Sequence, residues 1–318
     1  MAIRELEHTE LPFPNGWFAV EFSKNLGVGD SKPVHVFGED FVLFRTRSGK
    51  ARLLDAYCPH LGAHLGYDTR VIGEGVRCPF HGWQFDGESG KCSLIPYTER
   101  IPNEAQVRSW DVQEKNGLIF AWYHAEQKPP EWDFPELPEF SDPDWSEART
   151  FEFEMPTHVQ NMNENNNDPV HFVYVHGALE TPPTELQYED DGRVYRAISE
   201  VVKQTPDGPV PFKLVRDCWG LGLAAVRFEG LPGAGLLMFS STTPIERNRT
   251  VSRWLLTATN NIIDTAGAEF MEGITQGVMH DTNIWGHMIN RARPVLCDAD
   301  APLATYRKWV RQFYSEPV

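Results

Sequence analysis

Apolar and polar residues alternate in short runs over the first third of the chain, which predicts strands rather than helices. Gly-rich breaks such as Gly38-Glu39-Asp40 and Ser48-Gly49-Lys50 separate these runs, as expected of turns between antiparallel strands. We therefore expect a small antiparallel β domain over residues 17–128. Its clearest strand candidates are residues 34–37, 41–45, 51–56, 75–77 and 117–122.

The pattern changes twice further along the chain. Residues 129–148 hold five prolines among many acids, which predicts an extended linker packed against a surface. Residues 149–318 begin with an alternating strand at 150–155, and a helical period follows at 266–292 and 301–314, with Pro294 between the two. We expect an α+β fold in which helices cover an antiparallel sheet in this second domain. An irregular arm over residues 1–16 precedes the first domain. Further strands are predicted at residues 193–202, 221–228, 235–242 and 250–259.

Composition limits the classes of function. A length of 318 residues suggests about two domains, and a net charge of −16 argues against a nucleic-acid binder. No apolar run reaches the roughly 18 residues of a membrane-spanning helix, and the charged start does not look like a signal peptide. The five cysteines are scattered, which favours a reducing compartment over a disulfide framework. We expect a cytoplasmic protein.

The strongest chemical signal is a pair of matched Cys-and-His motifs. Cys58-Pro59-His60 is followed after seventeen residues by Cys78-Pro79-Phe80-His81, and Gly82-Trp83 comes next. Two thiolates and two imidazoles are the donor set of a Rieske [2Fe-2S] centre, in which two histidines replace two cysteines on one iron. Zinc takes the same ligands, but zinc fingers group two cysteines and then two histidines. We favour Cys58 and Cys78 on one iron and His60 and His81 on the other.

The ligands, their spacing and the flanking His-Gly-Trp resemble the Rieske family. Positions 61–63 and 80 lack the extra cysteines that form a disulfide in Rieske proteins of respiratory complexes. By this resemblance the domain falls in the low-potential branch that serves oxygenases.

A second concentration of donors is Glu164-x3-Asp168-x2-His171-x4-His176. On a helix Asp168, His171 and His176 would all address one side, although Pro169 predicts a kink or a new helix start at Asp168. Two imidazoles and a carboxylate form the facial triad of non-haem Fe(II) oxygenases. The alternative is a hydrogen-bonding network without metal.

The order of the two motifs resembles the catalytic subunits of Rieske non-haem iron oxygenases over nearly the whole chain. The resemblance implies that His171 and His176 bind a mononuclear Fe(II), and that Asp168 is a bridge for electrons from a Rieske histidine of a neighbouring subunit. His81 is the preferred partner of Asp168, with His60 as the alternative. Glu164 matches an acidic position of the family, and a solvated helix residue is its alternative.

The end of the chain resembles cholesterol 7-desaturases and 3-ketosteroid 9α-hydroxylases, in residues such as Ile284-Trp285, Asp300-Ala-Pro302 and Arg307-Lys-Trp-Val. This likeness implies Asp281 as the third iron ligand, with Asp264 and Glu272 as fallbacks. Met288 and residues 298–302 depart from those relatives.

The resemblance implies a monooxygenase that uses O2 and electrons from a reductase or ferredoxin, with NAD(P)H acting only through that reductase. A homotrimer and a hydrophobic, steroid-like substrate that is hydroxylated or desaturated are implied as well. One rival is an aromatic-ring or O-/N-dealkylating Rieske oxygenase. The other is a Rieske electron-transfer protein without oxygenase activity.

Overall fold

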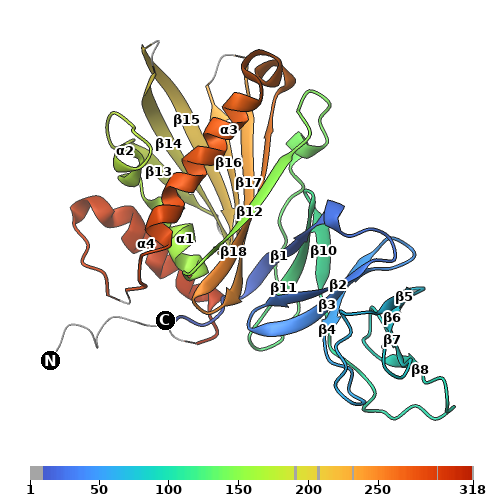
Figure 1. Ribbon diagram of the computed structural model, residues 1–318. Helices are drawn as coiled ribbons and strands as arrows, with labels where there is room; N and C mark the ends of the chain where they lie inside the picture. The colour runs from blue at the N-terminus through green and yellow to red at the C-terminus, as the bar shows by residue number, and fades with distance from the viewer. Residues whose placement is uncertain (1–9, 190–191, 206–207, 231–232, 292, 317–318) are drawn as a thin grey trace. The chain divides into compact units, whose positions relative to one another are not determined.

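The computed structural model describes residues 10–189, 192–205, 208–230, 233–291 and 293–316 of the chain. These residues form two units (Figure 1), of which one is Trp17–Glu131 and the other joins Met1–Gly16 to Trp132–Val318. Residues 1–9 of the predicted arm and position 292 of the predicted helix lie outside the described residues. Residues 10–16 and most of the predicted linker therefore group with the second unit.

The Trp17–Glu131 unit consists of three small antiparallel sheets. Strand Gly16–Phe22 is buried throughout, whereas strands Arg70–Ile72 and Gln84–Asp86 bury only their middle residue. The strand orders are β1-β11-β10, β2-β3-β4-β9 and β5-β6-β7-β8. The bounds are β1 Gly16–Phe22, β2 Ser31–Val36, β3 Glu39–Arg45, β4 Ala51–Asp55, β5 Arg70–Ile72, β6 Gly75–Arg77, β7 Gln84–Asp86, β8 Cys92–Leu94, β9 Ser109–Trp110, β10 Val112–Lys115 and β11 Leu118–Tyr123.

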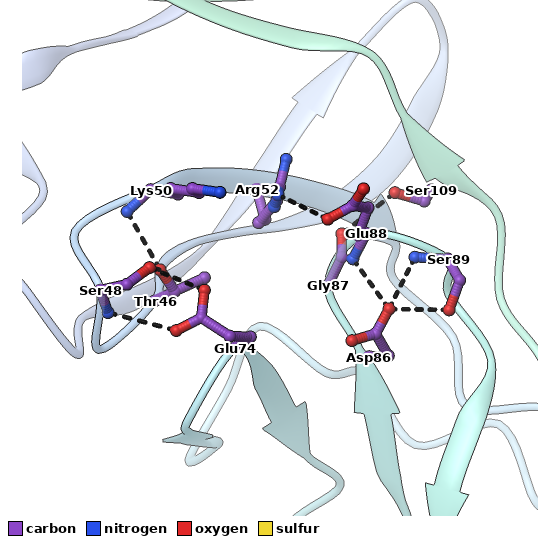
Figure 2. Close-up of polar contacts among 10 residues, drawn as sticks. All are labelled: Thr46, Ser48, Lys50, Arg52, Glu74, Asp86, Gly87, Glu88, Ser89 and Ser109. Carbon is purple, nitrogen blue, oxygen red and sulfur yellow. Dashed lines mark hydrogen bonds and ion pairs between the residues drawn. The ribbon is translucent and has the colours of Figure 1, made fainter.

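Turns of the β5-β6-β7-β8 sheet are hydrogen-bonded to the β2-β3-β4-β9 sheet (Figure 2). Ser48, which follows β3, donates its hydroxyl to Glu74 at 2.7 Å, and Arg52 of β4 contacts Glu88 at 3.2 Å. Glu88 is exposed, and such surface pairs contribute about 0–1 kcal/mol. The larger contribution comes from an apolar core that the two sheets share, which includes Leu54, Cys58 and Cys78.

Leu54→Ala should lower the free energy of unfolding by about 3 kcal/mol, because it leaves a cavity in this fully buried core. Chemical denaturation followed by tryptophan fluorescence measures the change. Leu94→Ala is the control, since Leu94 is 43% exposed and its truncation should cost less than about 0.5 kcal/mol. Equal effects of the two substitutions would contradict the assignment of the core.

The second unit is built on one seven-stranded antiparallel sheet in the order β12-β18-β17-β16-β15-β14-β13. Most of its connections are hairpins between consecutive strands, whereas β12 pairs with β18 from the far end of the sequence. Adding β12 at the edge of the sheet therefore requires a long-range pairing that no local sequence pattern specifies. The strands are β12 Arg149–Met155, β13 Thr184–Tyr188, β14 Val194–Thr205, β15 Gly208–Trp219, β16 Leu223–Glu229, β17 Leu236–Glu246 and β18 Arg249–Ala258.

Helices cover one face of this sheet (Figure 1). Helix α3, Asn260–Trp285, packs Ile262 and Met271 against Leu256 and its neighbours, and α4, Ala301–Trp309, packs Tyr306 against Tyr195. Two short helices, α1 Val159–Glu164 and α2 His171–Tyr174, lie between β12 and β13 in the sequence. This is the predicted α+β arrangement, a sheet gripped by a long helix. Within the described residues, no helix has both the length and the apolar character needed to cross a bilayer.

The linker segment lies along the opposite face of the sheet. Glu139 pairs with Arg227, and the ring of Phe140 packs edge-on against Phe239 at 6.1 Å. Proline favours such extended backbone because its φ is fixed, and the side chains on either side of it supply the contacts.

Several elements differ from the predicted ones: α3 ends at Trp285 rather than at 292, and no strand was predicted at β13. Two further differences have a clear physical cause. Helix α3 begins six residues earlier than the predicted 266, because Thr259 and the polar Asn260-Asn261 start the helix while Ile262 and Ile263 pack on the sheet. Strand β15 was missed because its first half carries Pro209 and Pro211. Those residues pair only with β14, and β16 joins from Lys213 onward, so the missing N–H groups face no second strand.

Candidate functional site

The two Cys-and-His loops of the Trp17–Glu131 unit have the same backbone geometry. The N–H of Gly62 donates to Cys58 O at 2.9 Å, and the N–H of Gly82 donates to Cys78 O at 3.1 Å. Both glycines adopt φ +76°, a conformation that side-chain-bearing residues rarely take. Further bonds run from Cys58 N to Ala63 O and from Cys78 N to Trp83 O. The loops are therefore two copies of one tight turn.

The four predicted ligands of these loops lie together. The imidazole rings of His60 and His81 have centroids 4.6 Å apart, and Cys58 and Cys78 are buried free thiols, with the Cys78 side chain within hydrogen-bond reach of Cys58. Burial raises the pKa of the Cys58 thiol to about 11, and a bound metal overcomes this by taking the thiolate. His60 Nδ1 is buried and has no hydrogen-bond partner among the described residues. An orphaned ring nitrogen and two buried thiols fit the donor set of a Rieske cluster.

Trp83 orients the first of these histidines. Its ring stacks on His60 with centroids 4.7 Å apart and planes 8° from parallel, and its indole N–H donates to Tyr97 Oη at 2.8 Å. The flanking His-Gly-Trp motif thus supplies a rigid wall for a ligand ring.

In the second unit, the chain breaks its helical course at Asp168. Helix α1 ends at Glu164, a single 3-10 turn spans Asn165–Asn167, and Asp168 is extended at φ −104° and ψ 100°. Pro169 causes this, because it clashes with helical geometry in the residue before it. Helix α2 then begins at His171, and Asp168 Oδ1 accepts hydrogen bonds from the N–H groups of Val170 and His171.

The break fixes the tautomer of His171. Its Nδ1 lies 2.5 Å from the carbonyl oxygen of Asp168, which can only accept, so Nδ1 carries the proton and Nε2 presents a lone pair. Burial lowers the pKa of His171, although Asp281 and Asp168 act in the opposite direction. A neutral imidazole is the form that binds a metal.

Three of the predicted iron ligands come together. One ligand atom from each of His171, His176 and Asp281 lies within 4.8 Å of the others, and His176 Nε2 is 3.4 Å from Asp281 Oδ2. Asp281 is 7% exposed and comes from α3, whereas the histidines come from α2 and the residues that follow it. Two imidazoles and one carboxylate on one side leave the other positions open, which fits the facial triad of non-haem iron.

The other predicted acids lie elsewhere. Glu164 contacts Arg307 at 2.7 Å, and Glu272 pairs with Arg149. Asp264 is exposed. Glu164 therefore has a partner that ties α1 to α4, and a catalytic part for it stays a prediction.

A cavity of about 210 Å³ lies at the three-residue group. His171, His176 and Asp281 form part of its wall, and most of the remainder is apolar. Of the residues that follow His171, Phe172 lines the cavity, whereas Tyr174 is 84% exposed and Val173 is not among the lining residues. Apolar wall residues include Met162, Ala178, Val201, Phe212, Leu214, Leu221, Leu223, Val226, Phe228, Met238, Ile274, Val278 and Trp285.

Sequence reasoning missed the polar residues of this wall, and two of them bear on its chemistry. Asn165 Nδ2 lies 3.3 Å from His171 Nε2, so the amide reaches the nitrogen that would bind iron. Arg216 lines the same cavity from β15. The available signal for Arg216 was its charge within the run Leu214-Val-Arg-Asp-Cys-Trp219. Charged side chains are almost never fully buried in a strand unless they are paired.

Family models match both units. A Rieske [2Fe-2S] domain matches residues 16–110, and the 3-ketosteroid 9alpha-hydroxylase C-terminal domain matches residues 121–314, which is more than half of the chain. The chain belongs to the Rieske oxygenase family. The Cys58–His60 and Cys78–His81 loops of this oxygenase fall inside the first match, and the His171–His176–Asp281 group falls inside the second.

Relatives of this Rieske oxygenase align over nearly its whole length. Cholesterol 7-desaturase nvd 1 of Ciona intestinalis is 34% identical over 330 residues, covering 96% of this chain and 69% of the relative. The oxygenase component of 3-ketosteroid-9-alpha-monooxygenase from Mycolicibacterium smegmatis is 29% identical, with 99% and 86% covered.

Solved structures share the fold. NdmA of Pseudomonas putida CBB5 with caffeine superposes with a TM-score of 0.77 at 21% identity, covering 93% of this chain and 89% of that one. Dicamba monooxygenase bound to dicamba superposes with a TM-score of 0.75 at 20% identity, covering 95% and 98%. At this identity the likeness concerns the fold alone.

Proposed function

We propose that this Rieske oxygenase hydroxylates or desaturates a hydrophobic, sterol-like molecule at a mononuclear iron held by His171, His176 and Asp281. One observation carries the proposal: these three donors converge within 4.8 Å on a largely apolar cavity, in a chain that also contains a Rieske domain. A pure electron carrier would need no such cavity. Bound Fe(II) would supply O2 activation, and the cluster would supply single electrons.

Each side chain of the group has a part that its contacts define. The Asp168 carbonyl holds the His171 ring so that Nε2 faces the other ligands, and Asp281 brings the negative charge that a dication requires. Asn165 Nδ2 would hydrogen-bond an oxygen atom next to the metal position once Nε2 is occupied. The largely apolar wall would exclude water and hold a hydrocarbon part of the substrate near the metal position.

The proposed ligands of the [2Fe-2S] cluster are Cys58, Cys78, His60 and His81. A reductase or ferredoxin would deliver the electrons, with NAD(P)H oxidised by that reductase. The name of the mycobacterial relative, an oxygenase component, supports a separate electron donor.

Asp168 is the proposed connection between the two metal sites. Its Oδ1 accepts the N–H groups of Val170 and His171, while Oδ2 accepts none of the hydrogen bonds found among the described residues. The Asp168 side chain is 30% exposed, so Oδ2 can accept a hydrogen bond from another molecule. We infer that His81 of a neighbouring copy donates it, in a head-to-tail homotrimer that closes a ring of three such contacts.

The substrate class rests on the relatives. Their names specify cholesterol and 3-ketosteroids, and the apolar wall suits a fused-ring hydrocarbon skeleton. The rival class is an aromatic or an O- or N-alkyl compound.

Substrate-dependent O2 uptake tests the function. The iron-replete protein with a surrogate reductase is screened against steroids and aromatic compounds, and products are weighed by mass spectrometry. A steroid should stimulate O2 uptake with stoichiometric formation of a hydroxylated or dehydrogenated product. Coupled turnover of an aromatic compound, with every steroid uncoupled, would overturn the substrate class; no substrate-dependent uptake would favour an electron carrier.

A further inference from the structure

Arg216 is a buried cation in the wall of the cavity. It lies on β15 between Ala197 of β14 and Val226 of β16, on the sheet face that the helices cover, and it is 2% exposed. The residues two positions away from it along this face are Leu214 and Cys218. The guanidinium thus brings a charge to a face that is largely apolar and otherwise carries only small polar residues such as Ser199 and Ser240.

Its hydrogen-bonding groups are largely unused. Nη2 donates to Ser199 Oγ, whereas Nε and Nη1 are buried without a hydrogen-bond partner among the described residues. Cζ lies 5.3 Å from the ring centroid of Phe172, a weak cation–π contact. Burial lowers the pKa of Arg216 to about 10, with Cys218 and Tyr195 acting in the opposite direction and no carboxylate among the groups that affect it. The side chain therefore carries an uncompensated positive charge at neutral pH.

Other arginines of the same sheet are paired with acids. Arg196 and Arg227 both contact Asp217 on the opposite face, at 2.5 and 3.0 Å, and Arg249 contacts Glu154. Burying a cation without an anion destabilises a fold, so such a residue is explained better by a ligand than by packing.

We propose that Arg216 binds an acidic group of the substrate, and that the substrate is therefore an apolar carboxylic acid rather than a neutral sterol. This inference rests on the proposed function, because it concerns the same cavity. It makes Arg216 a specificity-determining residue. A carboxylate would neutralise the guanidinium with charge-assisted hydrogen bonds in a site shielded from water.

The position of Arg216 relative to the iron ligands suits such a substrate. Phe172 lies near both: its ring centroid is 5.3 Å from Arg216 Cζ and 5.6 Å from the centroid of His176. If the carboxylate of the substrate binds Arg216, carbon atoms one or two rings away from that carboxylate would lie next to the metal position. The apolar residues of the wall, such as Leu214, Val226 and Met238, would surround its hydrocarbon part.

Matched acid and ester ligands test the proposal. Binding to the iron-loaded, cluster-containing protein is measured by anaerobic calorimetry with cholanate and methyl cholanate, and with naphthoate and methyl naphthoate. Each pair has one skeleton with and without the charge. We expect the acid of a bound skeleton to bind about 10–100-fold more tightly than its ester. Equal affinities for acid and ester would overturn the proposal.

Substitutions then assign the preference to Arg216. Arg216→Met should abolish the preference for the acid, and Arg216→Lys should keep part of it because the charge remains. Arg216→Met should also raise the thermal unfolding midpoint, because an apolar side chain replaces an unpaired buried charge. Arg196→Gln, on the opposite face, is the control and should leave the preference unchanged. A lower midpoint in Arg216→Met with an unchanged acid preference would assign Arg216 to the fold alone.

The two skeletons separate this inference from the proposed function. A preference for naphthoate with no binding of either cholane compound would support the anion site and overturn the sterol-like class. Binding of both cholane compounds with equal affinity would support the sterol-like class and overturn the anion site. The wild-type comparison needs no substitution, so a poorly folding variant would not weaken it.

Discussion

Asp168→Asn should leave both metal sites loaded and still reduce coupled turnover by about 100-fold or more. Asparagine keeps an oxygen for the N–H groups of Val170 and His171, so the break between α1 and α2 and the orientation of His171 should persist. Asparagine lacks the negative charge of the carboxylate, whose Oδ2 would accept a hydrogen bond from the ring N–H of His81. Product formation per O2 consumed measures the effect, and iron and sulfide analysis verifies the metal sites.

Two controls sharpen this test. Asp264→Asn removes the same charge from an exposed position of α3 and should leave turnover unchanged. Co-expression of His81→Ala with Asp168→Asn tests the contact between copies, because mixed oligomers contain some interfaces in which both wild-type residues meet. Turnover that returns in the mixture supports the neighbouring-copy bridge. An Asp168→Asn enzyme as active as the wild type would eliminate the bridge.

Asp281→Ala should remove the mononuclear iron and lower product formation to background. The protein should bind about two irons per chain in place of about three, because one carboxylate of the facial triad is lost while the cluster ligands are untouched. The visible absorption of the cluster should stay the same, which shows that the first unit is intact. Iron analysis after removal of adventitious metal is the measurement.

Glu272→Ala is the matched control for this substitution. Glu272 lies on the same helix but pairs with Arg149 at the surface, so iron content and turnover should not change. Retention of about three irons in Asp281→Ala would show that another residue completes the site.

Local sequence patterns predicted the β structure of the first unit and the part of the second site that lies between Asp168 and His176. The spacing of Cys58, His60, Cys78 and His81, with glycines at equivalent positions, specifies two matched turns without reference to distant residues. Proline at 169 likewise determines the break at Asp168, since the clash is between neighbouring residues. The prediction of α+β layers succeeded because strand and helix periods differ along one chain.

Tertiary structure decided what distant segments do together. The sequence offered Asp281, Asp264 and Glu272 as possible third ligands, and family likeness rather than helical pattern favoured Asp281. Packing of α3 across the sheet brings Asp281 to His171 and His176 and leaves the other two acids away from them. Arg216 was missed for the same reason, because a charge becomes unusual only when folding buries it without an acid. Short local motifs indicate most of the candidate metal ligands of this chain. The shape and charge of the cavity depend instead on long-range pairing of strands and packing of helices.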